Sequence, residues 1–168
     1  LPVIVEDRAV YAQVRVPHPI GGQPRYLNPA SALAPNPRLS RIRPVEVRHP
    51  EVIVTEGAID ALSAAAAGYR AVGVLSAAYG DESVAVALSK LPHPLVLAFD
   101  ADDAGRAAAG RLVVILEARL RPPAVLDLGR GDLNAAMVRS ADWSTELSQR
   151  VDAAVGLGRF PAVAAISR

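Results

Sequence analysis

The sequence predicts an α/β protein: a four-stranded, largely parallel sheet with helices on both faces, preceded by a small, basic, β-rich segment. Two observations support this prediction. From residue 51 onward, short apolar runs alternate along the chain with helix-like segments. The apolar runs are continuous, which is typical of strands that are buried on both faces. Strands that alternate with helices in this way indicate a parallel sheet covered on both sides.

Residues 1–50 differ in character from the rest of the chain. They are rich in proline, lack helical periodicity, and hold seven arginines against three acidic residues. Residues 9–16 alternate well enough for a strand, and residues 24–44 indicate an irregular or short-stranded segment with many turns. A basic strip beside a more acidic body suits a protein that binds phosphates with one part, although a solvated, proline-rich surface has the same composition.

The elements after residue 50 are expected in regular alternation. Strands are expected at 51–56, 71–75, 94–99 and 124–128, and helices at 57–68, 81–91, 103–120 and 133–140. The long helix at 103–120 has a 3.6-residue period, which places an apolar set on one side: Ala108, Leu112, Ile115 and Leu116. One more helix and a tail are expected at the end of the chain.

These features divide the chain into three expected parts: residues 1–50, 51–140 and 141–168. The absence of cysteine excludes disulfides, thiolate zinc sites and cysteine nucleophiles. No run approaches the roughly 18 apolar residues of a membrane span, and the start lacks a signal-peptide pattern, so we expect a cytoplasmic protein without membrane contact. The chain opens at Leu1 in a strand-like run, which suggests a fragment of a longer protein.

Acidic residues follow three of the four predicted parallel strands. Glu56 follows the first, Asp100 and Asp102 follow the third, and Asp132 follows the fourth after a Gly-Arg-Gly turn. Asp60 lies one helical turn beyond Glu56 on the same face. Ligands of open parallel sheets bind beyond the carboxyl ends of the strands, and hard cations prefer carboxylate oxygens. The pattern therefore predicts a magnesium or manganese site at this edge.

Each of these residues also has a structural interpretation. Asp102 or Asp103 would serve as the cap of the long helix, and Asp132 as the cap of the helix that follows it. Asp60 would be a solvated helix residue or a partner of a ligand. Gly57 and Gly105 each follow an acidic residue into the first turn of a helix, where a missing side chain lets a phosphate or a metal approach the backbone.

The stretches VIVTEGAIDALSAAAAG, LVLAFDADDAGRAAA and GRGDLNAAM resemble the Toprim domain, and among its branches the DnaG-type primases and the phage primase-helicases. The resemblance rests on two motifs and a third acidic stretch: Glu56, Gly57, Asp60 and Leu62; Asp100, Asp102, Ala104 and Gly105; and residues 131–134. It implies metal-dependent, DNA-templated nucleotidyl transfer that makes RNA primers. Single-stranded DNA and ribonucleoside triphosphates are then the expected partners, with a helicase or other domains of the parent chain.

The resemblance also assigns expected roles to individual residues. Asp100, Asp102 and Asp132 become metal ligands, and Glu56 becomes a ligand or the group that manages the proton of the nucleophile. The upstream stretch PRYLNPASALAPNPRL is similar to the segment before the Toprim domain of bacterial primases. It makes Arg25, Tyr26 and Asn28 candidates for contact with nucleic acid or nucleotide, although a packed tyrosine and a turn-forming Asn-Pro would look the same.

Arg106, one turn into the long helix, would meet a phosphate or form a surface ion pair. Three other functions remain open. A Toprim nuclease would use the same acids to activate water, and a binding module would keep the fold without catalysis. The stretch VLAFDAD also resembles the nucleophile motif of haloacid-dehalogenase-like phosphatases, but Ala104 stands where that family has threonine or valine. The zinc-binding module and helicase motor of primases are absent from this sequence.

Overall fold

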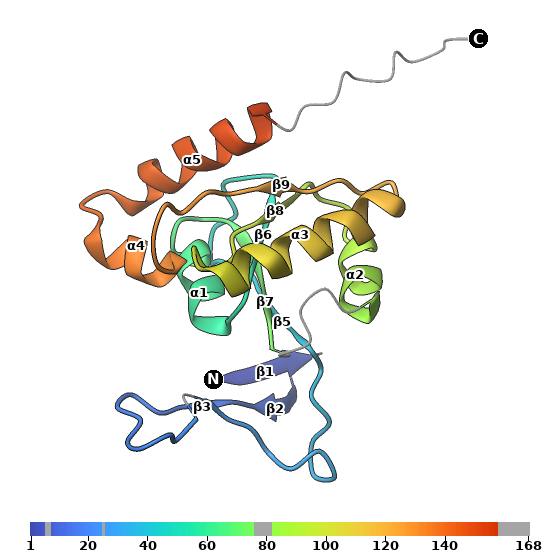
Figure 1. Ribbon diagram of the computed structural model, residues 1–168, viewed down its shortest axis with the longest axis vertical. Helices are drawn as coiled ribbons and strands as arrows, with labels where there is room; N and C mark the ends of the chain where they lie inside the picture. Colours follow the sequence, from blue (N-terminus) through green and yellow to red (C-terminus); the bar gives the residue numbers. More distant parts are fainter. Residues whose placement is uncertain (6–7, 25, 76–81, 158–168) are drawn as a thin grey trace.

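The computed structural model describes residues 1–5, 8–24, 26–75 and 82–157 of the chain (Figure 1). In these residues, a five-stranded sheet lies between two layers of helices, and two small two-stranded sheets lie beside it. Arg25, a candidate for nucleic-acid contact, lies outside the described residues. The α/β architecture predicted from the sequence is confirmed.

The main sheet has the strand order β5-β7-β6-β8-β9. The four predicted strands are present and parallel to one another: β6 (Val52–Thr55), β7 (Arg70–Val74), β8 (Leu95–Leu97) and β9 (Ala124–Val125). A fifth strand, β5 (Leu39–Ile42), pairs antiparallel with β7 at one edge. It comes from the proline-rich segment, where only an irregular or short-stranded stretch was expected. The division of the chain at residue 50 stays a prediction.

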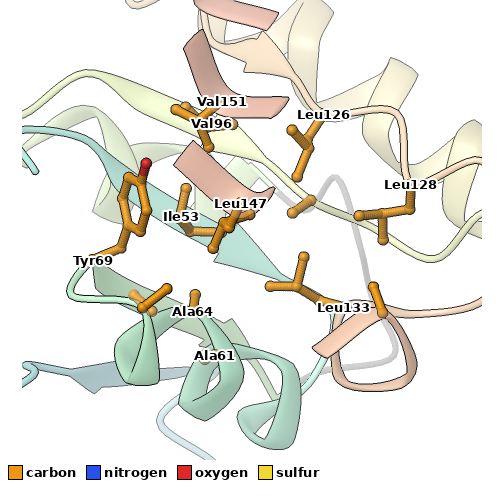
Figure 2. Packing of buried hydrophobic residues seen from close by; sticks show 14 of the residues in the cluster. Ile53, Ala61, Ala64, Tyr69, Val96, Leu126, Leu128, Leu133, Leu147 and Val151 are labelled. Carbon is orange, nitrogen blue, oxygen red and sulfur yellow. The ribbon is translucent and has the colours of Figure 1, made fainter. Parts of the chain in front are cut away.

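Side chains alternate between the two faces of this sheet, and each face has its own helices. Ile53 and Val96 point into a core formed with α1 (Ala58–Ala66), α4 (Leu133–Arg139) and α5 (Trp143–Leu157), as Figure 2 shows. Val54 and Leu97 point into a second core formed with α2 (Glu82–Ser89) and α3 (Asp103–Ala118). The prediction of helices on both faces is therefore confirmed.

The long helix α3 buries the stripe that its periodicity predicted. Ala108, Leu112 and Leu116 are fully buried against the sheet, and Ile115 is partly buried at the margin of the same core. None of the helices in the parts of the chain that the structure describes is both long and apolar enough to cross a membrane.

The predicted strand at residues 9–16 is divided between two small sheets. β2 (Arg8–Ala12) pairs with β1 (Pro2–Val5), and β3 (Val14–Arg15) pairs with β4 (Tyr26–Leu27). Gln13 stands at the junction: its amide donates to the Leu1 carbonyl at 2.9 Å, and its side chain donates to Asn28 Oδ1 at 3.0 Å. Side-chain alternation runs on through such a junction, so the sequence pattern did not reveal it.

The first small sheet packs against the main domain. Val3 and Tyr11 are buried together with Ala58, at the start of α1, and Leu75, just after β7. In Figure 1, β1 and β2 lie below β5 and β7, the two strands at one edge of the main sheet. The N-terminal segment is thereby held close to the strand ends where the acidic residues emerge.

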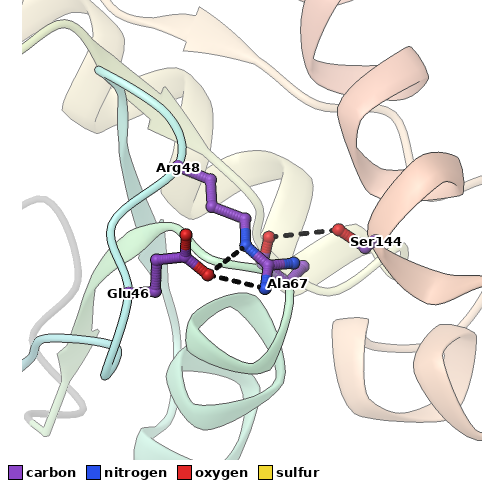
Figure 3. A network of polar contacts seen from close by, with 4 residues as sticks. All are labelled: Glu46, Arg48, Ala67 and Ser144. Atoms are coloured by element: carbon purple, nitrogen blue, oxygen red, sulfur yellow. Dashed lines mark hydrogen bonds and ion pairs between the residues drawn. The ribbon is translucent and has the colours of Figure 1, made fainter.

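The C-terminal helix α5 is joined to α1. The Trp143 indole donates to the Ser63 carbonyl at 2.7 Å, and the Ser144 hydroxyl donates to the Ala67 carbonyl at 3.3 Å. Figure 3 shows the second of these bonds beside the ion pair of Arg48 with Glu46, at 2.8 Å. Residues that precede the main sheet and residues of the C-terminal helix therefore meet around the C-terminal end of α1.

Replacement of Leu147 by alanine tests whether α5 is an integral part of the core. Leu147 is fully buried, so truncation should leave a cavity and lower the free energy of unfolding by about 2–5 kcal/mol. Val114 on α3 is 66% exposed, and Val114→Ala is the control, expected to change stability by less than about 0.5 kcal/mol. Urea unfolding followed by circular dichroism measures both. Equal stabilities of the two variants would show that α5 does not belong to the cooperative unit.

Candidate functional site

A polar cavity of about 200 Å³ lies at the carboxyl ends of β6 and β8, which are neighbours in the sheet. Four of the predicted acidic residues line it: Glu56, Asp60, Asp100 and Asp132. The remaining lining residues come from the start of α1, from α4 and from the N-terminal segment: Gly57, Ile59, Asn134, Arg15 and Tyr26. Topology therefore gathers residues that are far apart in the sequence.

Glu56 and Asp100 are joined across the two strand ends. The Asp100 amide donates a hydrogen bond to Glu56 Oε1 at 3.1 Å. Thr55, the last residue of β6, donates from its hydroxyl to the Gly57 carbonyl at 2.8 Å and so fixes the turn that carries Glu56. The Asp100 amide thus holds one oxygen of the Glu56 carboxylate, and the Thr55 hydroxyl steadies the turn that carries the residue.

Asp132 reaches the cavity through a short loop after β9. Gly129 and Gly131 have φ values of 69° and 70°, which are accessible to glycine with little strain. The Gly131 carbonyl accepts a hydrogen bond from the Ala101 amide at 2.9 Å, which ties this loop to the one that follows β8. Asp132 then caps α4, because its Oδ1 accepts from the Ala135 amide at 2.6 Å. The predicted cap and the predicted place at the site are compatible.

Asp60 connects α1 to α4 at the floor of the site. Its Oδ1 accepts from the Asn134 amide at 3.0 Å, and the Asn134 side chain donates to the Ser63 hydroxyl at 3.1 Å. Asp60 is therefore held in place and is not a freely solvated helix residue. Asn134 was not singled out from the sequence, because its contacts depend on how the two helices pack.

The second aspartate of the Asp-x-Asp pair serves as a helix cap. Asp102 caps α3, its Oδ1 accepting from the Gly105 amide at 2.7 Å, and it does not line the acidic cavity. Asp103, which we expected to support the start of this helix, lies in its first turn. It pairs there with Arg106 at 2.6 Å, and Arg106 also donates to the Ala101 carbonyl at 2.9 Å.

Gly105 lies behind the acidic pair. A Cβ atom at this position would lie 2.5 Å from Glu56 Oε1 and would collide with the Asp100 carbonyl. The space that glycine leaves is thus filled by the two acidic residues themselves. At Gly57 a Cβ would meet only Asp60 Oδ2, at 3.3 Å, and the Tyr26 hydroxyl, at 4.0 Å. Gly57 is the glycine that faces the cavity.

The acidic residues repel one another. Burial is the largest cause that raises the pKa of Asp100 to about 7, and the charges of Glu56, Asp60, Asp132 and Asp102 raise it further. Burial also raises the pKa of Asp60, and the charge of Asp132 adds to this, whereas hydrogen bonding to Asn134 and the charge of Arg15 oppose it. The cavity therefore carries an excess of negative charge that a cation would neutralise.

The donor set fits a hard divalent cation. The described lining residues offer oxygen donors, which are the four carboxylates, the Asn134 side-chain amide and the Tyr26 hydroxyl, and oxygen donors suit Mg²⁺ or Mn²⁺. Within the described part of the chain, no three histidine or acidic side chains are close enough to form a metal-binding group. A cation here would accordingly be held by one or two carboxylates and by waters, which is the usual way in which proteins bind Mg²⁺.

The N-terminal segment contributes to the rim of the cavity. Tyr26 lines the cavity, as its predicted role requires, and Arg15 of β3 lines it as well. Arg15 was missed because one arginine within an alternating strand has no distinguishing signal. Asn28 does not line this cavity; its Oδ1 accepts the hydrogen bond from Gln13 instead.

Replacement of Gly105 by alanine tests the tight packing behind the acidic pair. The added Cβ must displace the Asp100 backbone or Glu56, so the variant should lose about 1–3 kcal/mol of stability. Gly110→Ala in the same helix is the control: a Cβ there meets nothing within 4 Å, and the variant should gain up to about 1 kcal/mol. Thermal unfolding compares the two variants. A Gly105→Ala melting temperature at or above that of the original chain would contradict the described packing.

Several solved structures of primases resemble this chain. The zinc-binding and RNA polymerase domains of the Aquifex aeolicus primase have a TM-score of 0.72 and 20% identity, over 91% of this chain and 39% of that one. A DNA primase domain from Pseudomonas aeruginosa has a TM-score of 0.69 and 25% identity, over 89% of this chain and 49% of that one. The primase fragment of the bacteriophage T7 primase-helicase has a TM-score of 0.51 and 26% identity, over 60% of this chain and 43% of that one.

The chain spans less than half the length of each of these primase chains. A search of curated protein sequences gives no match. The sequence model of a Toprim-like family matches residues 53–137. This range begins in β6 and ends in α4, so it contains every strand end that brings an acidic residue to the cavity. With this half of its length matched, the chain belongs to the Toprim-like family.

Proposed function

We propose that this chain is the Toprim catalytic part of a DNA primase, which joins ribonucleotides on a DNA template to make RNA primers. The reaction would require Mg²⁺ or Mn²⁺, with single-stranded DNA and ribonucleoside triphosphates as substrates. A replicative helicase or other domains of the parent protein are proposed partners, since one of the similar structures comes from a primase-helicase.

The observation that carries this proposal is the extent of the likeness to primases. The Toprim-like family match covers residues 53–137, whereas the match to the Pseudomonas aeruginosa primase domain covers 89% of the chain. The additional coverage takes in residues of the N-terminal segment, which supplies Arg15 and Tyr26 to the acidic cavity. A basic and an aromatic residue beside a cluster of carboxylates suit a substrate that carries phosphates and bases.

The acidic residues would divide the work at the site. Glu56 and Asp100 would hold the cation directly and Asp132 would hold it through water, with Asp60 as a nearby partner. Asp102 uses one carboxylate oxygen as a helix cap, and its other oxygen would reach the hydrated cation through water. The bound cations would stabilise the charge on the attacking and leaving oxygens of the phosphoryl transfer.

Glu56 has a second proposed role as the group that accepts the proton of the attacking hydroxyl. Its orientation supports this role, since the Asp100 amide holds one of its oxygens at 3.1 Å. Arg15 would contact a phosphate at the rim, and Tyr26 a base or a sugar. Arg106 is a weaker candidate for phosphate contact, because its guanidinium already binds Asp103 and the Ala101 carbonyl.

A Toprim nuclease is the second candidate, because it would use the same carboxylates to activate water for cleavage of DNA. The N-terminal segment at the rim of the cavity favours the primase. A module that binds nucleic acid without catalysis is the third candidate, and the acidic cavity argues against it, since clustered carboxylates repel a phosphate backbone unless a cation is bound.

Primer synthesis by this chain tests the proposal. Incubation with single-stranded DNA, labelled ribonucleoside triphosphates and Mg²⁺ or Mn²⁺ should give labelled RNA that depends on the template. Glu56→Gln should lower the rate at least about 100-fold, the range for loss of a group that transfers a proton. Arg111→Gln, an exposed residue of α3 outside the cavity, is the control and should keep the rate.

The products separate the three candidates. Shortened DNA without new RNA would identify a nuclease. A chain that binds DNA but gives neither product, and that binds no divalent cation in calorimetry, would be a binding module.

The affinity for Mn²⁺ should depend on pH because Asp100 must lose its proton before it binds a cation. Its pKa is raised to about 7, so the protonated form prevails below pH 7 and competes with the metal. Affinity should rise roughly fivefold between pH 6 and pH 7, reach about ten times its pH 6 value at pH 8, and level off above pH 8. Isothermal titration calorimetry measures this profile. In Asp100→Asn the affinity should be weak and nearly independent of pH, and an unchanged profile in that variant would remove Asp100 from the site.

A further inference from the structure

A second polar hollow lies on the other side of the loop that carries Asp132. It has a volume of about 450 Å³ and is bounded by the loop after β9, by α4 and by α5. Its charged lining residues are Arg130, Arg139, Arg150 and Glu146. We call these three arginines and their surroundings the arginine hollow. It shares no lining residue with the acidic cavity.

The charges of the arginine hollow are only partly balanced. Arg150 pairs with Glu146 at 2.8 Å and donates to the Asp127 carbonyl at 3.4 Å, so this arginine is already held within the protein. The ion pairs found among the described residues do not include Arg130 or Arg139. Both side chains are exposed. Two guanidinium groups thus remain at the rim to bind an anion.

The backbone fixes the position of Arg130. Gly129 and Gly131, on either side of it, both adopt a positive φ, and the Arg130 amide donates to the Leu128 carbonyl at 2.8 Å. The same loop delivers Asp132 to the acidic cavity. Arg130 therefore lies on the segment that separates the arginine hollow from the acidic cavity.

Arg139 lies at the opposite end of α4 from Asp132. The helix has 7 residues and is therefore about 10 Å long. A strand in a stacked, helical form has one phosphate for roughly every 3.4 Å, and an extended single strand has a wider spacing, so at most about three nucleotides span the length of α4. One strand can accordingly lie with one part at the acidic cavity and another in the arginine hollow.

We propose that Arg130 and Arg139, with Arg150 behind them, bind backbone phosphates of a single-stranded nucleic acid whose neighbouring nucleotides lie at the acidic cavity. The inference rests on the proposed function, since that strand is the template or the growing primer. It favours a strand over a free nucleotide because none of the described residues that line the arginine hollow is aromatic. Positive charge is enough to bind a backbone phosphate, whereas the binding of a free nucleotide is also strengthened when an aromatic side chain stacks on its base.

Binding of a labelled single-stranded oligodeoxynucleotide, followed by fluorescence anisotropy at constant Mg²⁺ over a range of monovalent salt concentrations, tests the inference. Arg130→Gln and Arg139→Gln should each weaken binding roughly fivefold, and the double variant should lower the salt dependence by about 1.4 in log–log slope. Arg139→Lys keeps the charge and should restore most of the affinity, which separates phosphate binding from a role of Arg139 at the end of α4. Arg111→Gln is the matched control with the same change of charge.

A fluorescent ribonucleoside triphosphate forms the second arm of the experiment. The inference holds if the Gln variants lose affinity for the oligonucleotide but keep their affinity for the nucleotide. It is overturned if the Arg130→Gln and Arg139→Gln variants lose affinity only for the nucleotide, or if neither affinity changes. It is also overturned if Arg111→Gln weakens strand binding as much as those two variants do. The strand-binding assay contains no ribonucleoside triphosphate and requires no synthesis. Arginine-dependent strand binding in a chain that makes no RNA would therefore defeat the proposed function alone, and synthesis with unaltered strand binding would defeat this inference alone.

Discussion

The crowding of carboxylates at the ends of β6 and β8 is the constraint on which the site depends. Parallel strands end at one edge of the sheet, so Glu56 and Asp100 meet there, and Asp132 joins them from the loop after β9. The chain reduces the cost of this crowding with backbone donors. The amide of Asp100 binds Glu56, and the amide of Asn134 binds Asp60. Burial, and after it the charge of the neighbouring carboxylates, raises the pKa of Asp100 to about 7, and this remaining charge favours a bound cation.

Helix α1 connects this charged edge to the rest of the molecule. Its first turn carries Asp60, its middle holds Ser63 against Asn134 of α4 and Trp143 of α5, and its start packs on the N-terminal sheet through Ala58. A change in any of these contacts would move Asp60 relative to the other acidic residues. The helix layer that looks purely structural in Figure 2 therefore also positions the site.

Much of the fold could be predicted from the sequence because parallel α/β proteins have a strong local signature. Val52–Thr55 is buried on both faces and is apolar up to its last residue, and α3 shows a clear helical period. Strand β5 lacked such a signal. It lies at an edge and exposes Arg41, so its composition resembled that of a loop. The junction at Gln13 was missed because strand alternation does not show which sheet a residue joins.

The candidate site, like the fold, could be predicted from the sequence only in part. The sequence alone determined which residues are acidic, that they follow strand ends, and that they belong with the Toprim pattern, because these properties depend on residue type and spacing. Only the tertiary structure decided that Asp102 turns to cap α3, that Gly105 makes room for Glu56, and that Arg15 reaches the acidic cavity. Those outcomes depend on side-chain directions and on contacts between segments far apart in the chain, which a one-dimensional pattern does not contain.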